Sequence, residues 1–240
     1  MASARLPQLP AETDPFRNCL ALALALSEAC QNGDALVVEA VASSGLLSRP
    51  NFEQGMLGAC RRGRLNVLKV IVRHGVVDLP QFVQCFPRAF TCTGYGGHTH
   101  VAQWLLDAGM APSPADWYEL LQKACGEGHL AAAQWALRHS GGCVDADVRT
   151  NANQLFQFAC ANGRIHVAKW LLGLGHVDIH AHDNWAMTKA VRNGHAEVCR
   201  WLLGLDPDDA AWPAWIFPMV RVWSPVRDVW MRSVARARMP

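Results

Sequence analysis

Ala159-Cys-Ala-Asn-Gly-Arg-Ile-His-Val-Ala-Lys-Trp-Leu-Leu172 is one copy of a pattern that recurs along most of this 240-residue chain. Each copy has a glycine, numbered here as position 0, followed by apolar residues at positions +4, +7 and +8. The position-0 glycines, spaced by 30, 34, 31, 35 and 31 residues, are Gly33, Gly63, Gly97, Gly128, Gly163 and Gly194. Position +7 is tryptophan in four consecutive copies: Trp104, Trp135, Trp170 and Trp201. A period of this length indicates a repeat protein.

Each repeat is predicted to be a pair of short helices. In the fifth repeat, residues 154–161 carry apolar side chains at helical spacing and stop at Gly163. A glycine there can take the left-handed conformation that ends a helix. Residues 166–174 then place their apolar side chains on one stripe. Because one such pair cannot bury this stripe alone, the repeats must stack, and we expect the tryptophans at +7 to form a ladder inside the core.

Composition narrows the function classes. The chain has 22 Lys and Arg against 20 Asp and Glu, a net charge of +2, so we expect no nucleic-acid partner. The apolar run 19–26 is too short to span a bilayer, and it follows Glu12 and Asp14, unlike a signal peptide. We therefore expect a soluble, cytoplasmic protein.

The nine cysteines do not indicate a disulfide framework. Four of them precede the position-0 glycine by three residues: Cys30, Cys60, Cys125 and Cys160. Equivalent positions on packed helices lie about 10 Å apart, which is too far for a disulfide. These thiols are predicted to be small buried hydrophobes in a reducing compartment.

The stretch 159–172, followed by Gly175-His-Val-Asp-Ile-His-Ala-His-Asp-Asn184, resembles the ankyrin repeat. The variant with Asp-Asn-x-Ala before the first helix and Trp-Leu in the second is similar to ankyrin proteins of large DNA viruses and amoebae. Residues 183–195 fit that variant. The Thr-Pro-Leu-His opening of the family is absent from every repeat of this chain.

The resemblance covers about residues 20–205 and implies an all-α solenoid of about six helix-turn-helix repeats. We divide the chain into a flexible N-terminal arm (1–14), an ankyrin-repeat domain (15–206), and a degenerate capping repeat or basic Trp-rich tail (207–240). Ser224-Pro225 is a good helix start, with serine as N-cap and proline at N1. Solenoids need such a terminal cap.

No catalytic or metal motif stands out. His176, His180 and His182 cluster in one connector, but no cysteine or carboxylate set with zinc spacing accompanies them. Phosphate-binding, nucleophile-elbow, zinc-protease and kinase signatures are absent from the sequence. We expect no enzyme activity, no metal and no cofactor.

Protein–protein recognition by a monomer is the predicted function. Binding is expected on the concave surface built from the first helices and from the connectors between repeats, here called fingers. Trp117 and Trp185 precede first helices and are the candidates for exposed aromatic anchors. The full set of predicted contact residues is Asp78, Phe82, Trp117, Tyr118, Asp147, Arg149, His180, His182 and Trp185.

Two alternatives stay open. The chain could recruit a ubiquitin ligase as a substrate adaptor, through its N-terminal arm or its C-terminal segment. It could instead bind a membrane surface through residues 212–230, where tryptophans and arginines alternate with apolar residues.

Overall fold

The computed structural model describes residues 15–78, 82, 88–206 and 212–216, without the side chains of residues 15–18, 146 and 147. Regular secondary structure in these ranges is entirely helical, which confirms the predicted all-α class. The helices are α1 (Pro15–Asn32), α2 (Ala35–Ser44), α3 (Arg49–Arg62), α4 (Leu65–Arg73), α6 (Arg88–Gly96), α7 (Thr99–Asp107), α8 (Pro114–Glu127), α9 (Leu130–His139), α10 (Asp145–Ala161), α11 (Ile165–Gly173), α12 (Ala181–Arg192) and α13 (Ala196–Leu205).

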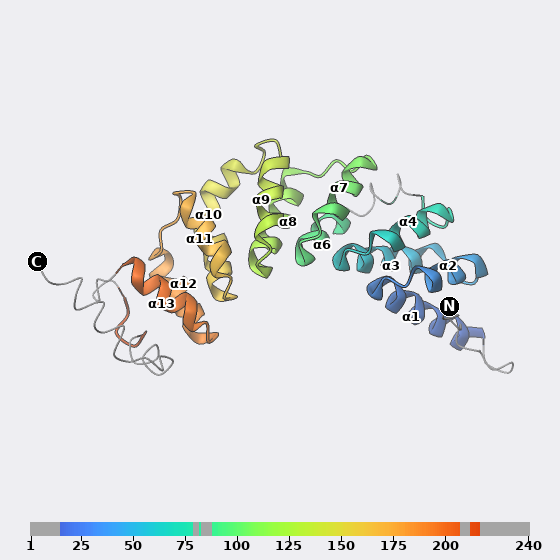
Figure 1. Ribbon diagram of the computed structural model, residues 1–240, viewed down its shortest axis with the longest axis horizontal. Coiled ribbons are helices and arrows are strands. Elements are labelled where there is room, and N and C mark those ends of the chain that lie inside the picture. The colour runs from blue at the N-terminus through green and yellow to red at the C-terminus, as the bar shows by residue number, and fades with distance from the viewer. Residues whose placement is uncertain (1–14, 79–81, 83–87, 207–211, 217–240) are drawn as a thin grey trace, which may run out of the picture. The chain divides into compact units, whose positions relative to one another are not determined.

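The helices pack in pairs, and the pairs stack, within each of two compact units (Figure 1). Unit 1 comprises Met1–Ala124 and Ala131–Val144, and unit 2 comprises Cys125–Leu130 and Asp145–Pro240. In unit 1 the first helices α1, α3 and α6 pack in one row, and the second helices α2 and α4 pack against each other beside it. In unit 2, α10 packs against both α11 and α12, and α12 packs against α13.

The position-0 glycines end the first helices, as predicted. All six have a positive φ, between 69° and 90°. At Gly63 the glycine N–H donates to Cys60 O at 3.3 Å, and the next N–H, of Arg64, donates to Ala59 O at 2.9 Å. This pair of bonds is the Schellman motif, which needs a left-handed residue that glycine adopts without steric cost.

The core of the second helices differs from the prediction at position +7. Residues at +4, +5 and +8 are buried in the fifth repeat: Val167, Ala168 and Leu171. The four tryptophans at +7 are only half-buried, so the predicted ladder inside the core is wrong. An α-helix turns by about 100° per residue. Position +7 therefore points about 110° away from the middle of the buried face formed by +4, +5 and +8, and lies at the edge of the apolar stripe.

Neighbouring repeats are joined by side chains that reach backbone atoms. Asn66 Nδ2 donates to Gly33 O at 3.0 Å, and Asn193 Nδ2 donates to Ala161 O at 2.6 Å. The ring of His98 lies over Gly63, where an added Cβ would be 2.5 Å from it. Contacts of this kind fix the register of one repeat on the previous one.

The predicted burial of the repeated cysteines is confirmed. Cys30, Cys60, Cys125 and Cys160 are completely buried and free. Burial raises the pKa of the Cys30 and Cys125 thiols to about 12. These thiols are therefore protonated at neutral pH and pack as small hydrophobes.

The N-terminal arm (1–14) and the capping helix expected from Ser224 lie outside the described residues. Within 207–240 the described part is 212–216, where Trp212 and Ile216 are buried. None of the helices in the described ranges has the length and hydrophobicity that a membrane span requires.

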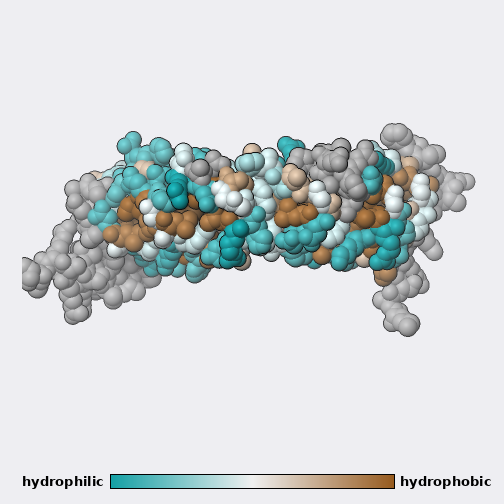
Figure 2. All heavy atoms as spheres, turned by 90° about the horizontal axis from the view of Figure 1, so that it is seen from above, coloured by the Kyte–Doolittle hydropathy of each residue, from teal (hydrophilic) through white to brown (hydrophobic). Residues whose placement is uncertain are grey.

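On the face drawn in Figure 2, hydrophobic residues gather in patches bordered by hydrophilic ones. Large apolar side chains are also exposed at single positions of the described chain. They are Leu20, Leu24, Leu36, Leu46, Leu205 and Trp215.

Candidate functional site

The first helix of each repeat carries a stripe of side chains at positions −9, −5 and −2 before the position-0 glycine. Because these positions are four and three residues apart, they lie on one face of the helix. We call this set the first-helix stripe. Apart from buried Ala161, its residues are exposed or half-buried. The stripe holds five cations, three aromatic rings and two carboxylates: Arg61, Arg88, Lys123, Lys189, Arg192, Tyr95, Phe158, Trp185, Glu28 and Glu119.

In unit 1 the stripe is centred on Tyr95 of α6. Arg61 Cζ, from α3, lies 4.8 Å from the centroid of the Tyr95 ring, and Lys123 Nζ, from α8, lies 5.0 Å from it. Cations at these distances are attracted by the negative face of an aromatic ring. A hydrogen bond with the Tyr95 side chain also raises the pKa of Lys123 above its usual value. The two neighbouring first helices, α3 and α8, therefore each place one positive charge against the Tyr95 ring.

A missing side chain lets α8 come close to α6. A Cβ added at Gly94 would lie 2.7 Å from the backbone oxygen of Leu120, so no larger residue fits without moving α8. The corresponding position of most other repeats is cysteine. Gly94 thus permits the approach that brings Lys123 to Tyr95.

Cys92 lies on the same stripe and is half-buried. Burial raises the pKa of its thiol, whereas the charges of Arg61, Arg88 and Lys123 lower it and that of Glu119 raises it. Because burial outweighs the cations, the thiol stays protonated at neutral pH, and protonated thiols are poor nucleophiles.

In unit 2 the stripe is centred on Trp185 of α12. The ring of Phe158, from α10, meets the indole edge to face, with centroids 6.3 Å apart and an interplanar angle of 83°. Lys189 Nζ lies 5.3 Å from the centroid of the Trp185 ring. Since Lys189 is one turn further along α12, this cation and its ring belong to the same helix.

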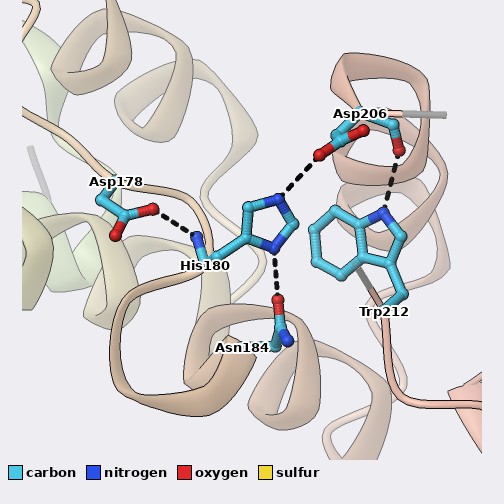
Figure 3. A network of polar contacts seen from close by, with 5 residues as sticks. All are labelled: Asp178, His180, Asn184, Asp206 and Trp212. Carbon is cyan, nitrogen blue, oxygen red and sulfur yellow. Dashed lines mark hydrogen bonds and ion pairs between the residues drawn. The ribbon is translucent and has the colours of Figure 1, made fainter. Parts of the chain in front are cut away.

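The finger before α12 is held by hydrogen bonds (Figure 3). His180 lies at its centre: Nδ1 is 2.6 Å from Asn184 Oδ1, and Nε2 is 2.9 Å from Asp206 Oδ2. The Trp212 ring packs on the imidazole with centroids 4.5 Å apart, and Trp212 Nε1 donates to Asp206 O at 2.9 Å. The finger, the end of α13 and the segment at Trp212 are therefore connected through one histidine.

The beginning of α12 contains a short left-handed turn. His182, Asp183 and Asn184 have φ values of 56°, 55° and 60°. Asn, Asp and His are the non-glycine residues that most often adopt this conformation. Gln157 Nε2 of α10 lies 2.9 Å from His182 Nδ1 and donates to Ala181 O at 3.3 Å, which anchors the turn that leads into Trp185.

The three histidines of the predicted cluster thus contact different residues. His180 bonds to Asn184 and Asp206, His182 contacts Gln157, and His176 is exposed. In the part of the chain that the structure describes, no group of three or more His, Cys, Asp or Glu side chains is arranged as a metal site.

Two of the predicted contact residues are corrected. Phe82 has no exposed surface and Trp117 is 6% exposed, so neither is an exposed anchor. Trp117 is enclosed by Phe90, 4.8 Å away between ring centroids, and by Trp135, 5.6 Å away. The aromatic ring expected at the surface is therefore part of the packing between helices of unit 1.

The other predicted contact residues lie in different surroundings. Asp78, Arg149 and His182 are exposed, whereas Tyr118, His180 and Trp185 are half-buried. The backbone of Asp147 is in α10, and its side chain lies outside the described part.

The sequence prediction missed most of the stripe. Of its cations and rings, Trp185 alone was among the predicted contact residues. The signal was available in the recurring −9, −5 and −2 columns, because their spacing already places them on one helix face. What the spacing could not give is which side chains of neighbouring repeats touch.

Comparison with known proteins identifies part of the repeat region. Residues 121–211 match the family model of ankyrin repeats, in three copies. The ankyrin resemblance predicted from the sequence is confirmed there, while similarity to the viral and amoebal variant stays a prediction. No curated protein matches the chain.

Proposed function

Because residues 121–211 carry ankyrin repeats, which are generally protein–protein interaction modules, we propose that this chain is a non-catalytic scaffold that binds a protein partner. In each unit, the binding surface is the first-helix stripe with the fingers beside it. The observation that carries the proposal is that the rings of Tyr95 and Trp185 are half-buried. Each ring is held in place by contacts with the first helix of a neighbouring repeat.

The physical basis is pre-organisation. Aromatic and arginine side chains supply much of the binding energy at protein interfaces, and ordering flexible side chains opposes association. The rings of Tyr95 and Trp185 are already positioned by neighbouring helices, so little further ordering is needed when a partner docks. Arg61 and Arg88 supply arginine, which like the aromatic residues is enriched at such interfaces.

Site-specific photo-crosslinking tests the surface. A photoreactive residue is placed at an exposed stripe position of each unit, Gln54 or Gln154, and at an exposed second-helix position of the same unit, Lys69 or Arg200. In cell extract, the stripe position of each unit should crosslink a partner protein, identified by mass spectrometry, and the second-helix position should not. Crosslinks formed mainly from Lys69 and Arg200 would refute this surface.

The ligase-adaptor alternative rests on segments that lie mostly outside the described residues, and it remains a prediction. Deleting residues 1–20 or 207–240 should abolish co-purification with a ligase if it is right. The membrane alternative loses one of its residues, because Trp212 is 3% exposed and bonded to Asp206 O. Trp215 is exposed, and liposome flotation of a Trp215→Ser variant tests whether it contacts lipid.

A further inference from the structure

Positive charge gathers around Tyr95 in the unit 1 part of the first-helix stripe. That part holds three cations, Arg61, Arg88 and Lys123, and two carboxylates, Glu28 and Glu119. Arg61 and Lys123 lie 4.8 and 5.0 Å from the centroid of the Tyr95 ring, so two of the three cations are concentrated at one ring.

The stripe cations are also not held in ion pairs within the described residues. Elsewhere Arg49 pairs with Glu53 at 2.7 Å and Arg164 with Glu127 at 3.7 Å. None of the five stripe cations forms an ion pair with a carboxylate of the described chain. A partner can therefore supply that carboxylate.

The spacing in unit 1 defines the partner further. Arg61, Arg88 and Lys123 come from α3, α6 and α8, one cation per repeat, and Tyr95 lies between Arg61 and Lys123. Arg61 Cζ and Lys123 Nζ both lie within 5.0 Å of the centroid of the Tyr95 ring, so these two charges are at most about 10 Å apart. An extended peptide rises about 3.3 Å per residue, so carboxylates about three residues apart can reach both cations.

We propose that the unit 1 part of the stripe binds an extended acidic segment of a partner protein, with a carboxylate at about every third residue. Partner carboxylates pair with Arg61 and Lys123 next to Tyr95, and Arg88 adds positive charge to the same stripe. This inference rests on the proposed function, which it deepens by naming the chemistry of the partner.

A peptide fits this surface better than a nucleic acid does. Glu119 lies one turn before Lys123 on the same stripe, and its charge acts on that lysine. A nucleic-acid backbone carries a negative charge at every nucleotide and would place some of them against Glu119. A peptide can place a neutral residue there.

Fluorescence anisotropy with the full chain tests the proposal. The probe is a labelled peptide of about ten residues, long enough to extend past both Arg61 and Lys123, with Glu at every third position among Gly and Ser. The matched probe has Gln in place of Glu. We expect the Glu peptide to bind at least about tenfold more tightly, and its affinity to fall as salt is added.

Paired charge variants locate the site. Arg61→Gln with Lys123→Gln should weaken binding of the Glu peptide about fivefold or more. Lys69→Gln with Arg73→Gln removes two exposed cations from α4 and should leave the affinity within about twofold. The comparison of Glu and Gln probes on the unchanged chain needs no variant, so it holds even if a double variant folds poorly.

Three results would overturn the proposal. The first is that the Glu and Gln peptides bind equally or that neither binds. The second is that the stripe variant and the α4 variant lose the same affinity for the Glu peptide. The third is that a single-stranded oligothymidylate binds more tightly at the same residues and displaces the Glu peptide. If the peptide test fails while crosslinks still form from Gln54 and Gln154, only the acidic-partner inference fails. If crosslinks form from Lys69 and Arg200 instead, the proposed binding surface itself is wrong.

Discussion

Tyr95 in unit 1 and Trp185 in unit 2 are both aromatic residues of the first-helix stripe with a cation against the ring, but the cations come from different places. Tyr95 receives Arg61 and Lys123 from the helices on either side. Trp185 receives Lys189 from its own helix, and its neighbouring helix contributes the Phe158 ring. The contacts of Tyr95 depend on the register between repeats. Of the two contacts of Trp185, the one with Lys189 lies within α12 and does not depend on that register. A change in stacking should therefore disturb Tyr95 more than Trp185.

The largest expected contrast between the regions is in thiol reactivity. Cys92 beside Tyr95 is half-buried, whereas Cys160 in the first helix α10 is fully buried, and burial raises the pKa of both thiols. Alkylation of Cys160 requires local opening, so it should be roughly a thousandfold slower if opening costs about 4 kcal/mol.

Mass spectrometry after timed iodoacetamide treatment of the folded chain measures the two rates. Exposed Cys143 reports the rate of an unprotected thiol. Similar rates at Cys92 and Cys160 would contradict the difference in burial.

Gly94→Ala should have the next largest effect. Alanine normally stabilises a helix interior relative to glycine by about 1 kcal/mol, but here its Cβ would overlap the backbone of Leu120. We expect a net destabilisation of about 1–3 kcal/mol in chemical denaturation, together with loss of the Lys123–Tyr95 contact.

Gly173→Ala in α11 of unit 2 is the matched control. Nothing lies within 4 Å of a Cβ at Gly173. This variant should be neutral or stabilised by up to about 1 kcal/mol. Equal effects of the two substitutions would show that the close approach at Gly94 does not limit stacking.

A double-mutant cycle on Phe158 and Trp185 isolates the ring contact of unit 2. With each residue changed to Leu, the coupling energy should be about 0.5–1.5 kcal/mol, the range for edge-to-face aromatic pairs. The cycle is read from urea denaturation of the four chains. A coupling indistinguishable from zero would leave Trp185 positioned by α12 alone.

The smallest expected effect is that of the cations on their rings. Lys123→Met and Lys189→Met keep the aliphatic part of each side chain and remove the charge, so each should cost about 0.5–1 kcal/mol at these half-buried sites. If register matters as argued, adding Gly94→Ala should abolish the effect of Lys123→Met and leave that of Lys189→Met unchanged. Thermal unfolding of the single and combined variants checks this.

The features that the sequence predicted correctly are determined locally. Gly63 and Gly163 end their helices because the left-handed conformation is a property of one residue, and a repeated glycine at fixed spacing reports it. The buried cysteines are predictable for a similar reason, since their neighbours in the helix fix which face they occupy.

The features that it missed depend on contacts between helices. Trp117 was expected at the surface because it was predicted to precede a first helix, but it lies within α8, where Phe90 and Trp135 enclose it. The tryptophans at +7 fit an apolar stripe by spacing alone, yet the stacked neighbours cover positions +4, +5 and +8 instead. The grouping of Arg61 and Lys123 around Tyr95 required the register of three repeats.

Asn66, Asn162 and Asn193 each donate a hydrogen bond to a carbonyl oxygen of the preceding repeat. A carbonyl oxygen is the same chemical group whatever side chain its residue carries. Each joint therefore recognises the main chain of its neighbour and not the neighbour's composition. Gene duplication or loss of a whole repeat leaves such a joint usable, because the acceptor is present in every repeat. The length of the array can therefore change while the chemistry of its joints stays the same.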